Sequence, residues 1–192
     1  MLKHQKLIKL LATLWLPVLL GLVAISGLYA DETEKRRVDI SISIFPRIVA
    51  VDNQFRDKLD KEKKTLLLFV YDSDKDFAED LAARMLSENN NIGGMLVDTR
   101  VMSVEEELSA TEVPTAIFIV EKLDQVRLEK VMAYAASTHR LLFSPYIGDV
   151  ERGVMVGVSV TNRVKPYFNV SALRNSEVVI NALLMKMSKR HE

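Results

Sequence analysis

Two short runs of continuous apolar residues constrain the fold of this 192-residue chain more than any other feature. They are Thr65–Tyr71 and residues 116–120, and neither run alternates between apolar and polar positions. A strand that is apolar at nearly every position is buried on both faces, as in parallel sheets that are covered by helices. The pattern therefore predicts two central strands of a mainly parallel sheet.

Each of these runs is followed by a helical pattern. Asp74 is a good N-cap residue, and Phe77, Leu81 and Met85 recur at the spacing that places side chains on one face of a helix. Asp124 caps a second segment of this kind. Its apolar face is formed by Leu128, Val131, Met132 and Ala135. The alternation of strands and helices predicts an α/β fold, a single domain with a mainly parallel sheet flanked by helices.

The C-terminal part of the chain departs from this alternation. Residues 154–160 and 164–170 are strand-like and are separated by three polar residues, which predicts a β-hairpin. Pro166 cannot donate a hydrogen bond to a neighbouring strand, so it indicates an edge strand or a bulge. From Ser171 onward, apolar residues at helical spacing predict a terminal amphipathic helix. These residues are Leu173, Ile180, Leu183, Leu184 and Met187.

The segment 38–54, ahead of the first apolar run, fits two patterns. Its apolar residues alternate as far as Ile44, as in a strand, but Ile40, Ile44 and Ile48 also have the spacing of a helix. Pro46 is unfavourable inside a helix because it has no N–H to donate. Spacing alone leaves both patterns open.

Residues 1–30 have the pattern of a secretory signal. Three lysines precede an uncharged stretch from Leu10 to Ala30, and the chain becomes acidic and polar at Asp31. An uncleaved inner-membrane anchor is the alternative, because the stretch is long enough to span a bilayer. In either case the rest of the chain is predicted to be periplasmic, with residues 31–37 as a polar linker and residues 38–192 as one α/β domain.

Composition excludes several classes of function. The chain has no cysteine, so thiol chemistry and disulfides are excluded. No cluster of basic residues with interleaved aromatic residues is present, which argues against a nucleic-acid partner. No motif for a cofactor or a metal is present.

The histidines and the nucleophile motifs give no support to an enzyme. His139 is the only histidine within the predicted fold, since His4 lies in the signal and His191 is next to the last residue. The chain has no nucleophile elbow, no zinc-binding helix motif and no phosphate-binding loop. We therefore expect no catalytic residues and interpret His139 as structural.

An acidic cluster, Asp72, Asp74 and Asp76, follows the first apolar run. It begins like a calcium loop, but Phe77 takes the place of the required glycine and Ala83 that of the final glutamate. The cluster also resembles the acidic pocket of phosphorelay receiver domains. Helix capping by carboxylates explains it more simply.

The end of the chain resembles the YfiR-like periplasmic proteins. Residues 148–158 read Gly-Asp-Val-Glu-Arg-Gly-Val-Met-Val-Gly-Val, and residues 163–170 read Arg-Val-Lys-Pro-Tyr-Phe-Asn-Val, ahead of a leucine-rich terminal segment. The resemblance is strongest over residues 148–187 and extends more weakly back to about residue 38. It implies an opening helix and a secreted α/β domain that regulates a membrane-bound signalling enzyme. In the best-known case the family member represses a diguanylate cyclase through its periplasmic sensor domain.

The chain departs from the family in two respects. Val154 takes the place of a glycine that usually precedes the methionine. The cysteines that form disulfides in the best-known member of the family are absent. The resemblance therefore does not imply that a disulfide controls the release of a partner from this chain.

The loop 144–153 is the candidate site, because its aromatic, acidic and arginine side chains are typical of a recognition surface. A loop whose charges simply face water is the alternative. The expected partner-binding residues are Tyr146, Asp149, Glu151 and Arg152 in the loop, and Arg174 on the terminal helix.

Two functions follow from this interpretation. The first is a periplasmic regulatory protein that binds the periplasmic part of a membrane signalling protein, such as a diguanylate cyclase or a sensor kinase, and modulates or represses it. The alternative is a periplasmic small-molecule-binding accessory protein of a transporter. No cofactor is expected, and a homodimer is left open.

Overall fold

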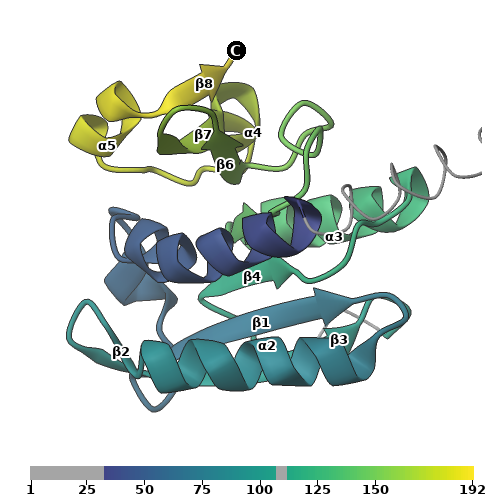
Figure 1. Cartoon of the computed structure of the whole chain (residues 1–192). Coiled ribbons are helices and arrows are strands. Elements are labelled where there is room, and N and C mark those ends of the chain that lie inside the picture. The colour runs from purple at the N-terminus through teal and green to yellow at the C-terminus, as the bar shows by residue number, and fades with distance from the viewer. Residues whose placement is uncertain (1–32, 107–111) are drawn as a thin grey trace, which may run out of the picture. The chain divides into compact units, whose positions relative to one another are not determined.

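The computed structural model describes residues 33–106 and 112–192 (Figure 1). The chain divides after Arg36 into two units, and the unit from Arg37 to Glu192 carries the α/β fold. The predicted secretory signal, residues 1–30, lies outside the described residues. Among the helices that are described, none is long and apolar enough to span a membrane.

An eight-stranded sheet forms the centre of the fold, with the order β2-β3-β1-β4-β5-β6-β7-β8. The five strands from β3 to β6 in this order are parallel to one another, whereas β2 and β7 run antiparallel to their neighbours β3 and β6. The predicted mainly parallel sheet is therefore confirmed. The strands are β1 (Thr65–Tyr71), β2 (Asn91–Ile92), β3 (Met95–Ser103), β4 (Ala116–Ile119), β5 (Leu141–Phe143), β6 (Val156–Val160), β7 (Val164–Asn169) and β8 (Lys189–His191).

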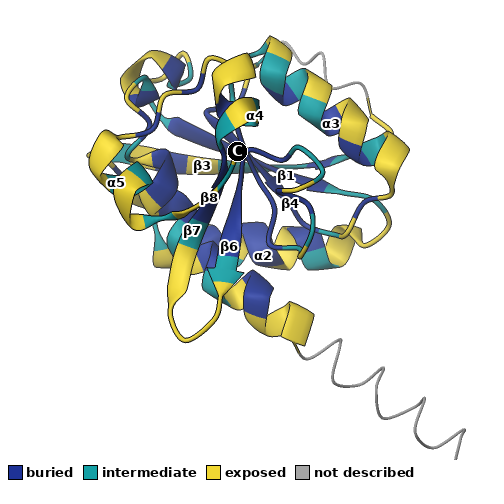
Figure 2. Ribbon diagram, turned by 90° about the horizontal axis from the view of Figure 1, so that it is seen from above, coloured by how far each residue is buried: buried dark blue, intermediate teal, exposed yellow. Residues whose placement is uncertain are grey.

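Helices cover both faces of this sheet (Figure 2). Residues 33–49 are helical, and the part from residue 37 onward lies on the same face as α2 (Lys75–Glu88). The Arg84 guanidinium of α2 is 2.8 Å from the Asp39 carboxylate. The helices α3 (Gln125–Ser137) and α4 (Val170–Asn175) cover the other face. Every residue of β4 is buried, as its continuous apolar sequence predicts.

Both predicted helix caps are present. The Asp74 carboxylate accepts a hydrogen bond from the Phe77 N–H at the start of α2, and Asp124 accepts one from the Arg127 N–H at the start of α3. Each carboxylate satisfies an N–H that the first helical turn leaves without a partner.

Segment 38–54 is helical up to residue 49, so the helical pattern of its apolar residues prevails over the strand pattern. Phe45 decides this, because its ring packs against Phe118 of β4 and Phe143 of β5 with centroid distances of 5.3 and 5.4 Å. Pro46 lies in the last turn of the helix, and its carbonyl accepts a hydrogen bond from the Ala50 N–H. The helix already includes residues 33–37, the segment that the sequence suggested as a linker.

The terminal segment differs from the prediction, because one amphipathic helix is replaced by α4, α5 (Ala182–Met187) and the strand β8. Glu177 has a φ of 56°, which ends the helical path. The β-branched residues 178–180 then run extended, and Ile180 forms a bridge to Asp52. Tertiary contacts of this β-branched stretch therefore override its helical spacing.

The predicted hairpin is present as β6 and β7, joined by residues 161–163. Its returning strand β7 is second from the edge, because β8 pairs beyond it. Since β8 pairs only from Tyr167 onward, Pro166 lies where the outer side of β7 has no neighbouring strand among the described residues. The missing N–H of Pro166 is accommodated there.

Candidate functional site

The loop 144–153 leaves the carboxyl end of β5 and leads towards β6 through turns rather than a helix. It packs closely on β6 at Gly157, where an added Cβ would lie 2.8 Å from Val150 Cγ2 and 3.0 Å from the Ser144 carbonyl oxygen. The loop reverses direction at Gly148 and Gly153, whose φ values of 92° and 115° suit only glycine well. The loop is thus held against the sheet by close contact.

Asp149 and Arg152 form the internal support of this loop. The fully buried Asp149 carboxylate accepts hydrogen bonds from Ser144 Oγ at 2.6 Å and from Arg152 Nη1 at 3.0 Å. Arg152 also donates to the Leu123 carbonyl and to the Gln125 side chain at the start of α3. Two of the expected partner-binding residues are therefore engaged inside the domain.

The other expected residues lie in different surroundings. The Tyr146 hydroxyl donates to the Val120 carbonyl at 2.6 Å, which ties the loop to the end of β4. Glu151 accepts a hydrogen bond from the Tyr167 hydroxyl at 3.0 Å. Arg174 is exposed in the last turn of α4 and is not among the residues that line the cavity described next. The structure brings together the four loop residues but leaves Arg174 apart.

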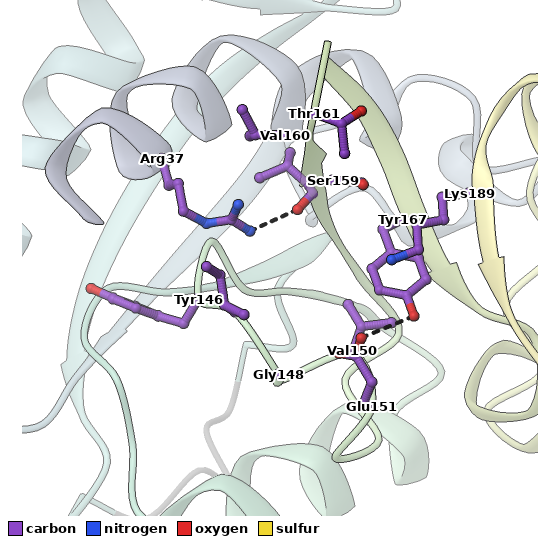
Figure 3. Close-up of a pocket in the computed structure, with 12 residues that line it drawn as sticks. Arg37, Tyr146, Gly148, Val150, Glu151, Ser159, Val160, Thr161, Tyr167 and Lys189 are labelled. Atoms are coloured by element: carbon purple, nitrogen blue, oxygen red, sulfur yellow. Dashed lines mark hydrogen bonds between the residues drawn. The ribbon is translucent and has the colours of Figure 1, made fainter. Parts of the chain in front are cut away.

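A cavity of about 220 Å³ opens between this loop and the hairpin β6–β7 (Figure 3). Arg37 lies on one side of it, and Tyr167 with Lys189 on the other. The buried Arg37 side chain donates to the carbonyls of Pro145 at 2.9 Å and Val158 at 2.7 Å. The sequence suggested Arg37 only as the end of a linker, because nothing in its neighbours shows that it is buried.

Tyr167 and Lys189 form the opposite wall. The Lys189 ammonium lies 4.0 Å from the centroid of the Tyr167 ring, a cation–π contact. Burial raises the pKa of the Tyr167 hydroxyl, and its hydrogen bond to the Glu151 carboxylate raises it further. Tyr167 therefore stays protonated and keeps donating to Glu151 at neutral pH.

Exposed apolar side chains surround the mouth of the cavity. Ile147 at the tip of the loop is 67% exposed, and Val160 at the end of β6 is 39% exposed; both line the cavity. Val164 is 42% exposed and lies opposite Val160 in the hairpin register. We call Ile147, Val160 and Val164 the loop–hairpin patch.

A second cavity, of about 440 Å³, lies between α3 and α4. Its walls are largely apolar, with Met132 from α3, Leu142 from β5 and Met155 just ahead of β6. Asn169, Asn175 and other polar residues join them from the α4 side. None of the residues expected at the site lines this cavity.

The acidic cluster after β1 does not assemble as a ligand site. Asp74 caps α2, and the Asp72 carboxylate lies 3.0 Å from Arg127 Nε. The described residues contain no group of acidic or histidine side chains that could hold a metal ion. The capping interpretation is thus confirmed for Asp74.

Glu121 instead fills the loop between β1 and α2. It follows β4, and its carboxylate accepts hydrogen bonds from the N–H groups of residues 72, 73 and 74 and from the Ser73 hydroxyl, at 2.7 to 3.2 Å. Glu121 thus lies at the switch point between β1 and β4, where the chain order of the sheet reverses and where open α/β sheets commonly bind ligands. The sequence feature that could have indicated Glu121 is its position directly after the second apolar run.

The stability contributed by Glu121 should depend on pH. Burial by itself raises its pKa, but the backbone and Ser73 hydrogen bonds outweigh burial and hold the pKa below the ordinary 4.5. A carboxyl with a lowered pKa stabilises the fold fully above its unfolded value and loses this effect as pH falls through the folded value. Glu121→Gln should cost about 1 kcal/mol at pH 7, because the carboxylate is partly exposed and screened.

Urea unfolding of Glu121→Gln and of the unmodified chain, at pH 7 and at successively lower pH below 4.5, measures this difference. The two stabilities should converge as the pH falls. A difference that does not change with pH would show that the charge of Glu121 has no part in it.

His139 has a structural position. It has a φ of 56°, and its Nδ1 lies 3.0 Å from the Ser176 carbonyl oxygen, so that it links the end of α3 to the segment after α4. This contact agrees with the interpretation of His139 as a structural residue.

The chain matches no protein-family model, and no curated protein matches its sequence. Two solved structures are similar to it at a TM-score of 0.47 each. One is the ABC domain in complex with L-Trp from Streptococcus pneumonia, at 13% identity over 74% of this chain and 61% of that one. The other is a conserved domain protein from Vibrio cholerae O1 biovar El Tor strain N16961, at 12% identity over 67% and 55%. This chain thus spans less than two thirds of either.

Proposed function

We propose that this protein is an exported regulatory protein that binds the periplasmic part of a membrane signalling protein and represses its activity. The observation that carries the proposal is the loop–hairpin patch, an exposed apolar surface formed by Ile147 of a firmly held loop and by Val160 and Val164 of the hairpin. The resemblance of residues 148–187 to the YfiR-like proteins supports the same function, since the patch lies within that segment apart from Ile147.

The firm support of the loop favours recognition. Arg152 and Tyr146 bind the loop to the start of α3 and the end of β4, and Asp149 braces it from inside through Ser144. Little conformational entropy therefore remains to be lost when a partner binds. Ile147 is then presented as a pre-organised aliphatic anchor beside the cavity that contains Arg37 and Lys189. An exposed aliphatic anchor with charged side chains nearby matches the apolar core and polar rim of a protein–protein contact.

The partner can be identified by a pull-down from detergent-solubilised membranes, and Ile147→Asp then tests the surface. Placing a carboxylate where an aliphatic side chain becomes buried should weaken binding at least about 30-fold, which corresponds to about 2 kcal/mol. Binding of the purified chain to the identified partner, measured by surface plasmon resonance, gives this value.

Leu96→Asp is the matched control. Leu96 in β3 is 61% exposed, close to the exposure of Ile147, and it lies outside the patch. We expect its affinity for the partner to stay unchanged. Equal affinities of Ile147→Asp and Leu96→Asp would move the recognition surface away from the loop.

A small-molecule-binding accessory protein is the second candidate function. The cavity between α3 and α4 supports it, because about 440 Å³ lies within the usual range for ligand sites, whereas the cavity near Arg37 is smaller. Met155→Trp would fill the larger cavity. A ligand found by thermal-shift screening that still stabilises this variant would not bind there.

A further inference from the structure

Charge is distributed unevenly along this chain. Residues 163–191 contain six basic residues and one acidic residue, whereas residues 37–162 contain 15 basic and 21 acidic residues. The net charge of the whole chain, which is zero, conceals this contrast. An asymmetry of this kind points to a partner of opposite charge for the basic part.

The structure gathers these cations at one end of the sheet. Strands β7 and β8 are paired neighbours, and α5 leads directly into β8 through Ser188 (Figure 1). Five basic side chains from these three elements and the hairpin turn are exposed, and we call them the basic edge. They are Arg163, Lys165, Lys186, Lys189 and Arg190.

The residues of the basic edge are not neutralised within the domain. Among the described residues, no carboxylate forms an ion pair with any of them, whereas many other cations of the domain are paired. The paired cations are Lys58, Lys64, Lys75, Arg84, Arg100, Arg127 and Arg152. The basic edge is therefore available to an external partner, with Lys189 also in contact with the Tyr167 ring and Glu192 as the acidic residue that follows it in sequence.

Apolar side chains project from the same region. None of the residues of α5 is buried, and Leu183 and Met187, one helical turn apart, are 67% and 60% exposed. Lys186 lies between them in sequence, and Lys189 and Arg190 follow. Exposed apolar residues interspersed with cations are typical of segments that lie in the interface of an anionic bilayer.

We propose that the basic edge and α5 dock onto an anionic membrane surface, with Leu183 and Met187 entering the headgroup region and the five cations contacting lipid phosphates. A second copy of the chain fits this surface poorly, because its own cations would face the same cations. A bilayer suits an exposed helix of this kind, since it accepts protruding apolar side chains without a complementary pocket.

Docking in this orientation would bring the chain to the surface in which a membrane partner is embedded. The proposal does not depend on that partner, however, and it is tested with lipid alone. Such binding is weak for a single amphipathic segment and depends strongly on salt, since ions screen the attraction between the cations and the lipid phosphates.

Co-sedimentation of the full chain with vesicles that contain phosphatidylglycerol, and with vesicles of phosphatidylcholine alone, tests the proposal. We expect binding to the anionic vesicles only, with a decrease at high salt. The apolar stretch near the N-terminus would also bind vesicles, and Lys3, Lys6 and Lys9 ahead of it favour anionic ones. The share of binding that belongs to the basic edge is therefore measured with the charge-reversal variant below. Equal binding of the unmodified chain to the two kinds of vesicle would overturn the proposal.

The variant Lys165→Glu/Lys186→Glu/Arg190→Glu should bind the anionic vesicles at least about 100-fold less, since each basic residue at such a surface contributes a factor of about five. Lys189 is left in place because it contacts the Tyr167 ring. The matched control is Lys61→Glu/Lys63→Glu/Lys122→Glu, which changes the net charge equally at exposed positions elsewhere. A loss as large in the control would overturn the proposal.

Two further measurements separate the alternatives. Met187→Trp adds an indole to α5, and its fluorescence is obtained by subtracting that of the unmodified chain. Brominated lipid should quench this added fluorescence. An unquenched signal from bound protein would overturn insertion by α5. Binding to poly-glutamate without binding to anionic vesicles would overturn the proposal in favour of an acidic protein partner. Circular dichroism confirms the folding of each variant.

Discussion

Lys58→Met is expected to lower the free energy of unfolding by about 3–5 kcal/mol, because it leaves a buried carboxylate without its partner. The Lys58 ammonium lies 2.6 Å from the Asp52 carboxylate, and each side chain is only 4% exposed. Water can therefore not replace the lost cation. The apolar methionine fits the stem of the lysine, so the cost arises mainly from the stranded charge of Asp52.

This ion pair lies where three parts of the chain meet. Asp52 follows the helix 33–49 and forms a bridge to Ile180, ahead of α5. Lys58 ends the short 3-10 helix η1 (Phe55–Lys58), and its carbonyl accepts a hydrogen bond from the Thr115 hydroxyl ahead of β4. Loss of the pair should therefore loosen the C-terminal segment together with the N-terminal helix.

Urea unfolding at neutral pH measures the effect, with Lys61→Met as the control. Lys61 is exposed in the next turn, and its replacement should change stability by less than about 0.5 kcal/mol. The double variant Asp52→Asn/Lys58→Met should recover much of the loss, because no unpaired charge remains. If Lys58→Met and Lys61→Met were equally stable, the pair would not be buried as described.

Asp149→Ala should destabilise the domain by about 3 kcal/mol and disorder the loop that carries Ile147. The substitution leaves the buried Ser144 hydroxyl and one side of the Arg152 guanidinium without an acceptor. Hydrogen bonds to charged groups contribute about 1.5–3 kcal/mol each, but Arg152 is partly exposed and regains water. Because Asp149 is fully buried, it acts on binding only through the position of the loop.

Glu151→Ala is the control within the same loop. The Glu151 carboxylate is exposed and supports only the Tyr167 hydroxyl, so its loss should cost less than about 1 kcal/mol. Urea unfolding gives the stabilities, and hydrogen exchange of the amides in residues 144–153 reports the order of the loop. Unchanged exchange in Asp149→Ala would contradict the supporting role of this carboxylate.

Local sequence was sufficient for the central elements of the fold. The strands β1 and β4 were predictable because a strand buried on both faces is apolar at almost every position, and this needs no knowledge of its neighbours. The caps of α2 and α3 were equally local, since an aspartate side chain reaches an N–H only three residues further on. The loop 144–153 was predicted as a partner-binding site from its own composition; several of its residues line a cavity, and partner binding there stays a prediction.

The roles of single side chains required the tertiary structure. Asp149 bonds to Ser144 and Arg152 within the loop itself. Arg152 also donates to residue 123 and to the start of α3, which sequence spacing does not bring near the loop. Arg37 is buried by contacts with residues more than 100 positions away. Charge and residue type thus singled out the loop, but not which of its side chains support it and which remain exposed.

The C-terminal segment shows most clearly what local sequence predicts and what only tertiary contacts decide. Its spacing satisfied a single helix, and propensity alone does not decide between a helix and an extended path for residues 178–180. Burial of Val178 and Ile180 and the bridge to Asp52 decide it, because they arise only when the ends of the domain meet. The sequence by itself determined the parallel sheet, its helices and the hairpin, since these depend on local periodicity. The tertiary structure alone decided the division into α4, α5 and β8, because long-range burial outweighs the small difference in local propensity.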